Sequence, residues 1–291
     1  MTRRTERPRG RSPFVGLAAP LLAALLVALG PVTPAAADEA PALRFAALPL
    51  ESREATAREF AGFVGHLEYL AGRRVEHVYV ARYEDLLADF AAGRLDLVFV
   101  GPLPYVELVR RRADAQQRGR FAESDGATRY RCVLAAFRGD AVRPVDLKGA
   151  AVGLPQALST CGPLSAGGLL HREAGLRLTD VDARVLGNHE TVALDIVAGE
   201  VRAGTLKESI ARKYAGLGLE ILAATDPLPG FVVVAGTDHL DEAAIERLRF
   251  GLLATPDTIW RTWGSSIHNG METARDEDYA PVRRLAEGSG R

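Results

Sequence analysis

The alternation of short apolar runs with segments of helical periodicity constrains the fold more than any other feature. Residues 43–48 form an apolar run that ends at Pro49, and residues 55–70 repeat apolar side chains at helical spacing. The alternation continues, with strands expected at 75–80 and 95–100 and helices at 83–90 and 105–112. Strands that alternate with helices imply βαβ units and a mostly parallel sheet.

A second series of the same kind follows a polar segment at 118–129, which is expected to form a loop. Further strands are expected at 130–137, 150–154, 183–186, 201–206, 220–224 and 231–235, with helices at 165–173, 191–198, 208–214 and 241–254. The chain is therefore predicted to have an α/β fold with two units of similar size. In open parallel sheets, ligands lie at the carboxyl ends of the strands. The loops expected to hold a site are thus 49–53, 81–84, 101–105, 155–162, 187–190 and 205–208.

The first 37 residues have the order of a secretory signal peptide. Arginines before residue 12 precede an apolar run at 14–29, and small residues lead up to Ala37. A membrane anchor is the alternative, but the run falls short of the roughly 20 residues that a comfortable span needs. We therefore expect export to the periplasm, cleavage near Ala37, and a mature chain that is not embedded in the membrane.

Composition argues against several classes of partner and cofactor. Across 291 residues, 36 Lys and Arg nearly balance 37 Asp and Glu, and the basic residues are scattered, so no nucleic-acid surface is expected. The six histidines are dispersed, and the sequence has no Cys-x-x-Cys spacing. A glycine-rich nucleotide loop is also missing. We expect neither a metal nor a cofactor.

A polar motif follows the apolar run at 150–154. The motif, Leu-Ser-Thr-Cys-Gly-Pro at 158–163, stands just before a helix-compatible segment. Hydroxyls, a thiol and unpaired backbone N–H groups at the start of a helix suit an oxyanion. An ordinary helix N-cap without a ligand is the alternative interpretation.

The chain contains two cysteines, Cys132 in an apolar strand-like run and Cys161 in the polar motif. In an oxidising compartment such a pair can form a disulfide. The sequence does not give the distance between their Cα atoms, on which the bond depends. A disulfide and two free thiols are both open at this point.

Several segments, in the same order, resemble one known family. They are Gly-Arg-Leu-Asp-Leu-Val-Phe-Val-Gly-Pro at 93–102 with Tyr105, Leu-Ser-Thr-Cys-Gly at 158–162, Gly-Asn-His-Glu at 187–190 with the helix after it, Pro-Leu-Pro-Gly at 227–230, and the tail at 276–281. These segments resemble the phosphonate, phosphite and phosphate periplasmic substrate-binding proteins of ABC transporters. The resemblance spans almost the whole mature chain, so it is more specific than any single motif.

The resemblance implies a two-lobed type II periplasmic binding protein fold with two hinge crossings. Lobe 1 would comprise 41–127 and 231–291, and lobe 2 would comprise 128–230, with the hinge near 128–130 and 226–231. A monomer of this kind would capture a small oxyanion (phosphonate, phosphite or phosphate) between the lobes and deliver it to the permease of an ABC transporter. Closure of two lobes excludes water from such an anion, which then accepts charge-assisted hydrogen bonds.

The resemblance also assigns the ligand-binding residues, which are Tyr83, Gly101, Ser159, Thr160, Cys161, His189, Glu190 and Lys207. Ser159, Thr160 and Cys161 would cradle the anion, together with backbone N–H groups. His189 would donate a hydrogen bond, and Tyr83 would close from the first lobe. The alternatives are a helix-capping or surface role for His189 and simple packing for Tyr83.

Two positions depart from the family pattern. Cys161 stands where the family often has Ser, and as a free thiol it would suit a soft oxyanion such as arsenite. Lys207 stands where an acidic residue is common, which would suit an aminoalkyl group. A lysine repels an ammonium and favours a simple, more anionic ligand. The alternative for Lys207 is a solvated residue at the start of a helix.

Two other functions are weighed against transport. A hydrolase would need a triad such as Ser159, His189 and Asp195, but Ser159 is not in a Gly-x-Ser-x-Gly turn. We therefore predict that the chain is not an enzyme. A periplasmic sensor that presents its ligand to a histidine kinase would keep the same fold, and the sequence does not separate it from a transport protein.

Overall fold

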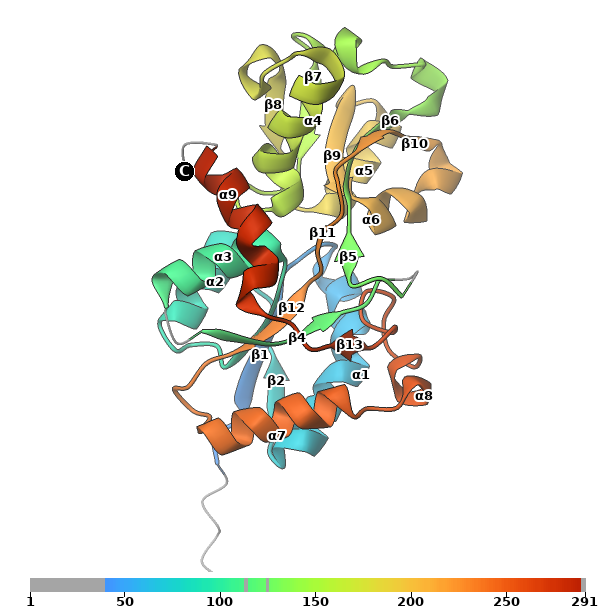
Figure 1. Cartoon of the computed structure of the whole chain (residues 1–291). Helices are drawn as coiled ribbons and strands as arrows, with labels where there is room; N and C mark the ends of the chain where they lie inside the picture. The colour runs from blue at the N-terminus through green and yellow to red at the C-terminus, as the bar shows by residue number, and fades with distance from the viewer. Residues whose placement is uncertain (1–39, 113–114, 124–125, 289–291) are drawn as a thin grey trace, which may run out of the picture. The chain divides into compact units, whose positions relative to one another are not determined.

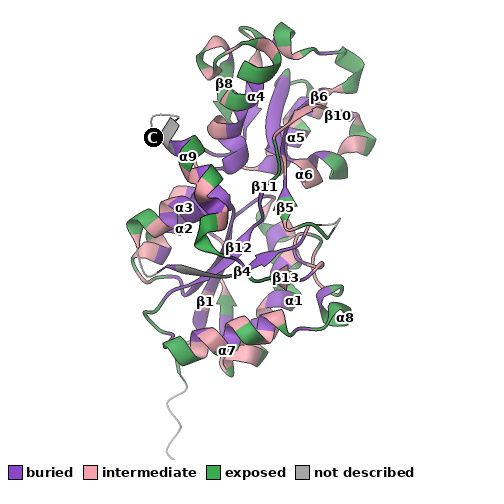
Figure 2. Ribbon diagram, in the orientation of Figure 1, coloured by how far each residue is buried: buried purple, intermediate pink, exposed green. Residues whose placement is uncertain are grey.

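The computed structural model describes residues 40–112, 115–123 and 126–288, so the predicted signal peptide lies outside the described residues. The structure contains two mixed β-sheets with helices packed against them and a short two-stranded ladder (Figure 1). Most strands are buried and the outward faces of the helices are exposed, whereas β8 at the edge of one sheet is exposed throughout (Figure 2). Among the described helices, none combines the length and the apolar character needed to cross a membrane.

The first sheet joins residues that lie far apart in the chain. Its strand order is β13-β4-β12-β3-β1-β2. The strands are β1 (Leu43–Ala47), β2 (Val75–His77), β3 (Leu97–Val100), β4 (Gln116–Phe121), β12 (Val232–Ala235) and β13 (Met271–Glu272). Its helices are α1 (Arg53–Ala71), α2 (Tyr83–Ala91), α3 (Pro102–Arg111), α7 (Glu242–Leu253), α8 (Asp257–Trp260) and α9 (Ala280–Gly288). We call this sheet and its helices the first half.

The second sheet is built from one continuous stretch of chain, in the order β10-β6-β9-β7-β8. Its strands are β6 (Cys132–Phe137), β7 (Ala151–Leu154), β8 (Asp182–Val185), β9 (Ala203–Lys207) and β10 (Leu219–Ala224). Its helices are α4 (Ser165–Ala174), α5 (His189–Ala198) and α6 (Glu208–Lys213). We call this sheet and its helices the second half.

Both sheets are mixed: most strands of each run in one common direction, as expected, and β6, β12 and β13 run against it. Strands linked by a crossover helix are parallel, as in β2-β1-β3 and β8-β7-β9. β12 is antiparallel to β3 and β4, and β6 is antiparallel to β9 and β10. β6 and β12 each enter a sheet directly from a segment that connects the two halves. Without a crossover helix before them, they are free to run against their neighbours.

Two short strands connect the halves. β5 (Arg129–Tyr130) and β11 (Leu228–Pro229) form an antiparallel ladder, seen between the sheets in Figure 1. Gly230 follows β11, and a Cβ at this position would lie 2.8 Å from the carbonyl oxygen of Thr128 and 2.9 Å from that of Phe121. The two connecting segments thus approach each other too closely for any residue but glycine.

The expectation of a loop at 118–129 is wrong at its start, because β4 extends to Phe121. The backbone of β4 pairs with β12, and that of its end pairs with β13. Arg120 is 8% exposed, and its guanidinium forms ion pairs with Glu272 and Asp278. These carboxylates come from the C-terminal segment. A polar strand is therefore stabilised by partners about 150 residues away in sequence, which no local pattern reveals.

A cluster of aromatic rings forms the core of the first half. Phe45 lies 5.6 Å from Phe60 and 5.5 Å from Phe63, measured between ring centroids. Phe99 lies 4.9 Å from Phe60 and 5.1 Å from Phe121. Each ring is at most 3% exposed, and burial of such a side chain stabilises a fold by about 1.5–3 kcal/mol.

Helix α1 shows how the local sequence sets an element. Ser52 caps its start, because the serine side chain accepts a hydrogen bond from the Ala55 amide. Gly72 ends it in the left-handed conformation, with φ 64°. The residues that α1 buries are spaced to fall on one face, which packs against the sheet: Thr56, Phe60, Phe63 and Leu67.

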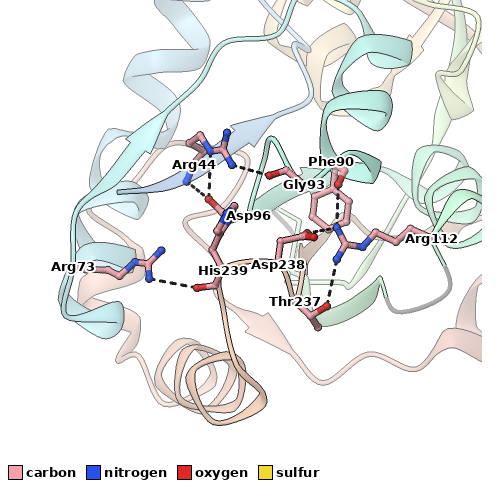
Figure 3. A network of polar contacts seen from close by, with 9 residues as sticks. All are labelled: Arg44, Arg73, Phe90, Gly93, Asp96, Arg112, Thr237, Asp238 and His239. Carbon is pink, nitrogen blue, oxygen red and sulfur yellow. Dashed lines mark hydrogen bonds and ion pairs between the residues drawn. The ribbon is translucent and has the colours of Figure 1, made fainter. Parts of the chain in front are cut away.

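A polar network links the starts of two strands of the first sheet, β1 and β3, to the loop after β12 (Figure 3). Asp96, whose side chain is 2% exposed, accepts hydrogen bonds from the Arg44 amide at 2.6 Å and interacts with His239 Nδ1 at 2.6 Å. Arg44 also donates to the carbonyl of Gly93 at 2.7 Å. Asp96 thereby joins the starts of β1 and β3 to the loop after β12. We assign this acid of the 93–102 motif a structural role.

Candidate functional site

A small cavity lies where strand ends of the two halves meet. Its lining residues come from both halves and are Leu48, Tyr83, Gly101, Pro104, Tyr130, Ser159, Thr160, Cys161, His189, Lys207 and Phe231. Several of them directly follow or end a strand: Leu48 follows β1, Gly101 follows β3 and Lys207 ends β9. The space open to the centre of a water-sized sphere is about 10 Å³, which is room for about one water-sized group.

The loop after β7 has a sharply defined backbone. Ser159 is extended, and the chain then turns through Thr160–Leu164 into α4. Gly162 interrupts this turn with φ −82° and ψ −137°. A Cβ at Gly162 would lie 2.4 Å from the carbonyl oxygen of Gln156, so only glycine fits. The loop therefore presents the Ser159 and Thr160 side chains in one arrangement.

Two further bonds fasten this loop. A disulfide joins Cys161 to Cys132 at the start of β6. Thr160 Oγ1 accepts a hydrogen bond of 2.9 Å from the Leu103 amide in the first turn of α3. Because Leu103 belongs to the first half, Thr160 also links the two halves at the cavity.

His189 is held as a neutral hydrogen-bond donor. It begins α5, which Asn188 caps by accepting from the Thr191 amide at 2.8 Å. Its Nδ1 accepts a hydrogen bond of 2.9 Å from the Lys207 amide, so the ring proton resides on Nε2. Nε2 lies 3.3 Å from Ser159 Oγ. Burial, assisted by the Lys207 ammonium, lowers the pKa of His189 to about 3.

Tyr83 places an unsatisfied hydroxyl at the cavity. Gln156 holds the start of α2, because its Oε1 accepts from the Tyr83 amide at 2.7 Å and its Nε2 donates to the Ala81 carbonyl at 3.0 Å. The Tyr83 side chain is 1% exposed, and burial raises its pKa. Ser159 is near enough to influence that pKa, yet no described residue meets the hydroxyl with hydrogen-bond geometry. A buried hydroxyl without a partner costs about 1–3 kcal/mol, which a bound acceptor would offset.

Lys207 brings a buried cation to the same cavity. Its side chain is 2% exposed, and its Nζ lies 2.9 Å from Glu123 Oε1. The ammonium also lies 4.6 Å from the ring centroid of Phe231 and 5.4 Å from that of Tyr130. Aromatic faces attract a cation at such distances. The alternative of a solvated Lys207 is therefore wrong.

The two halves are joined beside the cavity by backbone and side-chain contacts. The Leu50 carbonyl accepts hydrogen bonds from the amides of His189 at 3.1 Å and Glu190 at 3.2 Å. The Ser52 amide donates to Glu190 Oε2 at 2.9 Å, and the Tyr214 hydroxyl donates to Glu190 Oε1. The first N–H groups of α5 are thereby satisfied by the opposite half of the protein.

A family model matches residues 45–279, which is most of the described chain. Its description is "ABC transporter, phosphonate, periplasmic substrate-binding protein". The chain belongs to this family. The family consists of periplasmic substrate-binding components of transporters, so a small ligand and a transporter partner go with membership.

Solved periplasmic binding proteins share the fold at low sequence identity. PhnD1 from Prochlorococcus marinus (MIT 9301), solved with methylphosphonate, has a TM-score of 0.75 and 17% identity over 86% of this chain and 98% of its own. A binding protein component of an ABC phosphonate transporter from Pseudomonas aeruginosa has a TM-score of 0.76 and 17% identity over 86% and 87%. The alkanesulfonate-binding protein SsuA from Xanthomonas axonopodis pv. citri, solved with MOPS, has a TM-score of 0.53 and 20% identity over 86% and 80%. The fold is thus the α/β type II fold of the periplasmic binding proteins.

The structure brings most of the predicted site residues of this family member around one cavity. The lining includes Tyr83, Gly101, Ser159, Thr160, Cys161, His189 and Lys207. Glu190 is the exception, because its carboxylate accepts from Ser52 and Tyr214 and is not part of the lining. In this structure Glu190 thus joins the two halves beside the cavity. Tyr105 packs against Tyr279 and donates to Asp276, in keeping with a packing role.

Sequence reasoning missed two aromatic residues of the lining. Tyr130 belongs to β5 and Phe231 follows β11, so both lie on the segments that connect the halves. Gly101 allows Phe231 to approach, since a Cβ there would lie 3.2 Å from the phenylalanine ring. The signal for both residues was their position beside the expected hinge, where the connecting segments border the interface between the lobes.

Proposed function

We propose that this chain captures one small oxyanion, of the phosphonate, phosphite or phosphate kind, and delivers it to an ABC transporter. The two halves would act as lobes, with residues 41–127 and 231–291 in one and 128–230 in the other. The hinge would lie near 128–130 and 226–231. Family membership and the N-terminal pattern support export as a monomer that starts near Asp38.

The observation that carries the proposal is the unpartnered Tyr83 hydroxyl at a cavity lined by further donors. Ser159 and Thr160 offer hydroxyls, His189 offers an N–H, and Lys207 offers a buried ammonium. None of the described lining residues is an Asp or Glu. The carboxylate of Glu123, which pairs with Lys207, lies outside the lining, and the buried donors that line the cavity are complementary to an oxyanion.

The same geometry argues against catalysis by a Ser-His-acid triad. In such a triad, the histidine accepts the serine proton at one nitrogen and donates to an acid from the other. Here His189 Nδ1 accepts from the Lys207 amide, so Nε2 already carries the proton and is no base for Ser159. We therefore propose binding without chemical conversion.

The disulfide argues against a soft ligand. Arsenite would require the thiol of Cys161, which is bonded to Cys132 instead. A hard oxyanion that accepts hydrogen bonds fits the remaining donors better. The disulfide therefore favours phosphorus oxyanions over arsenite.

Calorimetry on the mature chain tests the proposal with phosphite, methylphosphonate, phosphate, sulfate and arsenite. At least one phosphorus oxyanion should bind with a dissociation constant of about 10 µM or less, well below millimolar. Tyr83→Phe and Ser159→Ala should each weaken binding roughly tenfold or more, because a hydrogen bond to a charged group contributes about 1.5–3 kcal/mol. Tyr69→Phe is the matched control, since Tyr69 is 79% exposed on α1. Binding of none of these anions, or a Tyr83→Phe variant that binds like the parent, would overturn the proposal.

A further inference from the structure

A second, wider pocket lies next to the cavity. We call it the outer pocket, and its lining residues are Glu123, Arg129, Tyr130, Arg131, Glu208, Ser209 and Arg212. Its volume is about 220 Å³, against about 10 Å³ for the cavity. Tyr130 lines both spaces, so the two are neighbours.

One ion pair stands between the two spaces. Lys207 lines the cavity, whereas its partner Glu123 lines the outer pocket, and their side chains meet at 2.9 Å. Both are well buried, with side-chain exposures of 2% and 14%. The rings of Tyr130 and Phe231 flank the Lys207 ammonium. The pair and the two rings together form a wall across the route from the cavity to the outer pocket.

The backbone on both sides of the wall is fixed. The Lys207 amide donates to His189, and β9 pairs Lys207 with Cys132 in β6. The Glu123 amide donates to the Ala127 carbonyl at 2.7 Å. A substituent on a bound anion could enter the outer pocket only by separating two buried charges that satisfy each other. Such a separation is unfavourable for Lys207, because its ammonium is 2% exposed and would lose its carboxylate partner.

We propose that the Lys207–Glu123 pair is a size filter that restricts this protein to compact oxyanions. The proposal rests on the function proposed above. In this proposal, the wall excludes phosphonates whose substituent is longer than a methyl group. In the wild type, the wall keeps substituents of the bound anion out of the outer pocket. Loss of the Lys207 side chain would let them enter it.

Calorimetry with methyl-, ethyl- and propylphosphonate tests the filter. The wild-type affinity should fall at least tenfold from methyl to propyl. Lys207→Ala opens the wall and should reduce that difference to less than threefold. Lys207→Met keeps the length of the side chain but leaves no ion pair to separate, so it should weaken binding of all three and reduce the preference for methyl less than Lys207→Ala does. Glu123→Ala removes the wall from the other side and should relax the preference as Lys207→Ala does.

The outcomes separate the filter from the function on which it rests. If methylphosphonate, phosphite and phosphate all fail to bind the wild type, the proposed function itself is wrong. If the wild type binds propylphosphonate as tightly as methylphosphonate, the filter is wrong while the function stands. A Lys207→Ala variant with native circular dichroism and the full wild-type preference would equally overturn the filter. The wild-type series alone decides the matter if the variants do not fold.

Discussion

Replacing His189 by Gln should remove a loss of stability that the wild-type chain suffers in mild acid. The unfolded chain binds a proton at this histidine with a pKa of about 6.5. In the folded chain, burial and the Lys207 charge lower the pKa of His189 to about 3. Between these values the unfolded state binds more protons than the folded state, so stability falls as the pH falls. The contribution of neutral His189 to the free energy of unfolding is complete above about pH 6.5 and decreases as the pH is lowered to about 3.

The magnitude follows from the width of this window. At about pH 5 the unfolded chain is 1.5 pH units below its own pKa, which corresponds to about 2 kcal/mol of lost stability. Urea unfolding at about pH 7.5 and pH 5 measures the loss for the wild type and for His189→Gln. The loss should be smaller by about 2 kcal/mol in the variant. Burial also lowers the pKa values of His66 and His77, but their effects are shared by both proteins and cancel.

This prediction would be refuted by an equal loss of stability in the two proteins. It would be refuted just as clearly if NMR showed the His189 ring titrating near its ordinary pKa in the folded chain. Either result would mean that the Lys207 amide does not hold His189 in its neutral form. The assignment of His189 as a neutral donor to the ligand would then fall as well.

Three further changes have defined outcomes. Replacing Cys132 and Cys161 together by Ala should lower the free energy of unfolding by about 3.5 kcal/mol, because the disulfide closes a loop with a sequence separation of 29; urea unfolding measures it. Gly230→Ala should destabilise the chain by about 1–3 kcal/mol, since its Cβ would overlap backbone oxygens of the connecting segments, whereas Gly167→Ala, with open space around it, should not. Glu190→Gln should speed ligand release in stopped-flow measurements without abolishing binding, because Glu190 joins the halves outside the cavity; complete loss of binding would restore it as a ligand contact.

The fold was largely readable from the sequence where packing is local. The spacing of Phe60, Phe63 and Leu67 predicts a helix at 55–70, and α1 spans Arg53–Ala71. The apolar run at 95–100 likewise contains β3. Strand β4 was missed because its partners come from β12 and from the C-terminal segment. The antiparallel strands were missed because the direction of a strand depends on the route of the chain between the halves.

The candidate site was predictable to a similar degree. Loops at the ends of strands carry Ser159, Thr160 and His189, and these loops do meet at one cavity. Sequence alone did not show that the Glu190 side chain turns away, because the helix position is the same for either orientation. It also did not show Glu123 as the partner of Lys207, since that ion pair joins residues of different halves.

The position of β12 in the first sheet bears on the order in which the protein can be made. β12 lies between β3 and β4, yet it is among the last strands along the chain. The second sheet uses only residues between 132 and 224, so its contacts are local and form early. Until β12 pairs, β3 and β4 in the first sheet each have an unpaired edge. Such edges are sites for wrong pairing between chains. Removal of the residues after 231 would therefore unfold the whole first half, including its N-terminal strands, and not only the end of the chain.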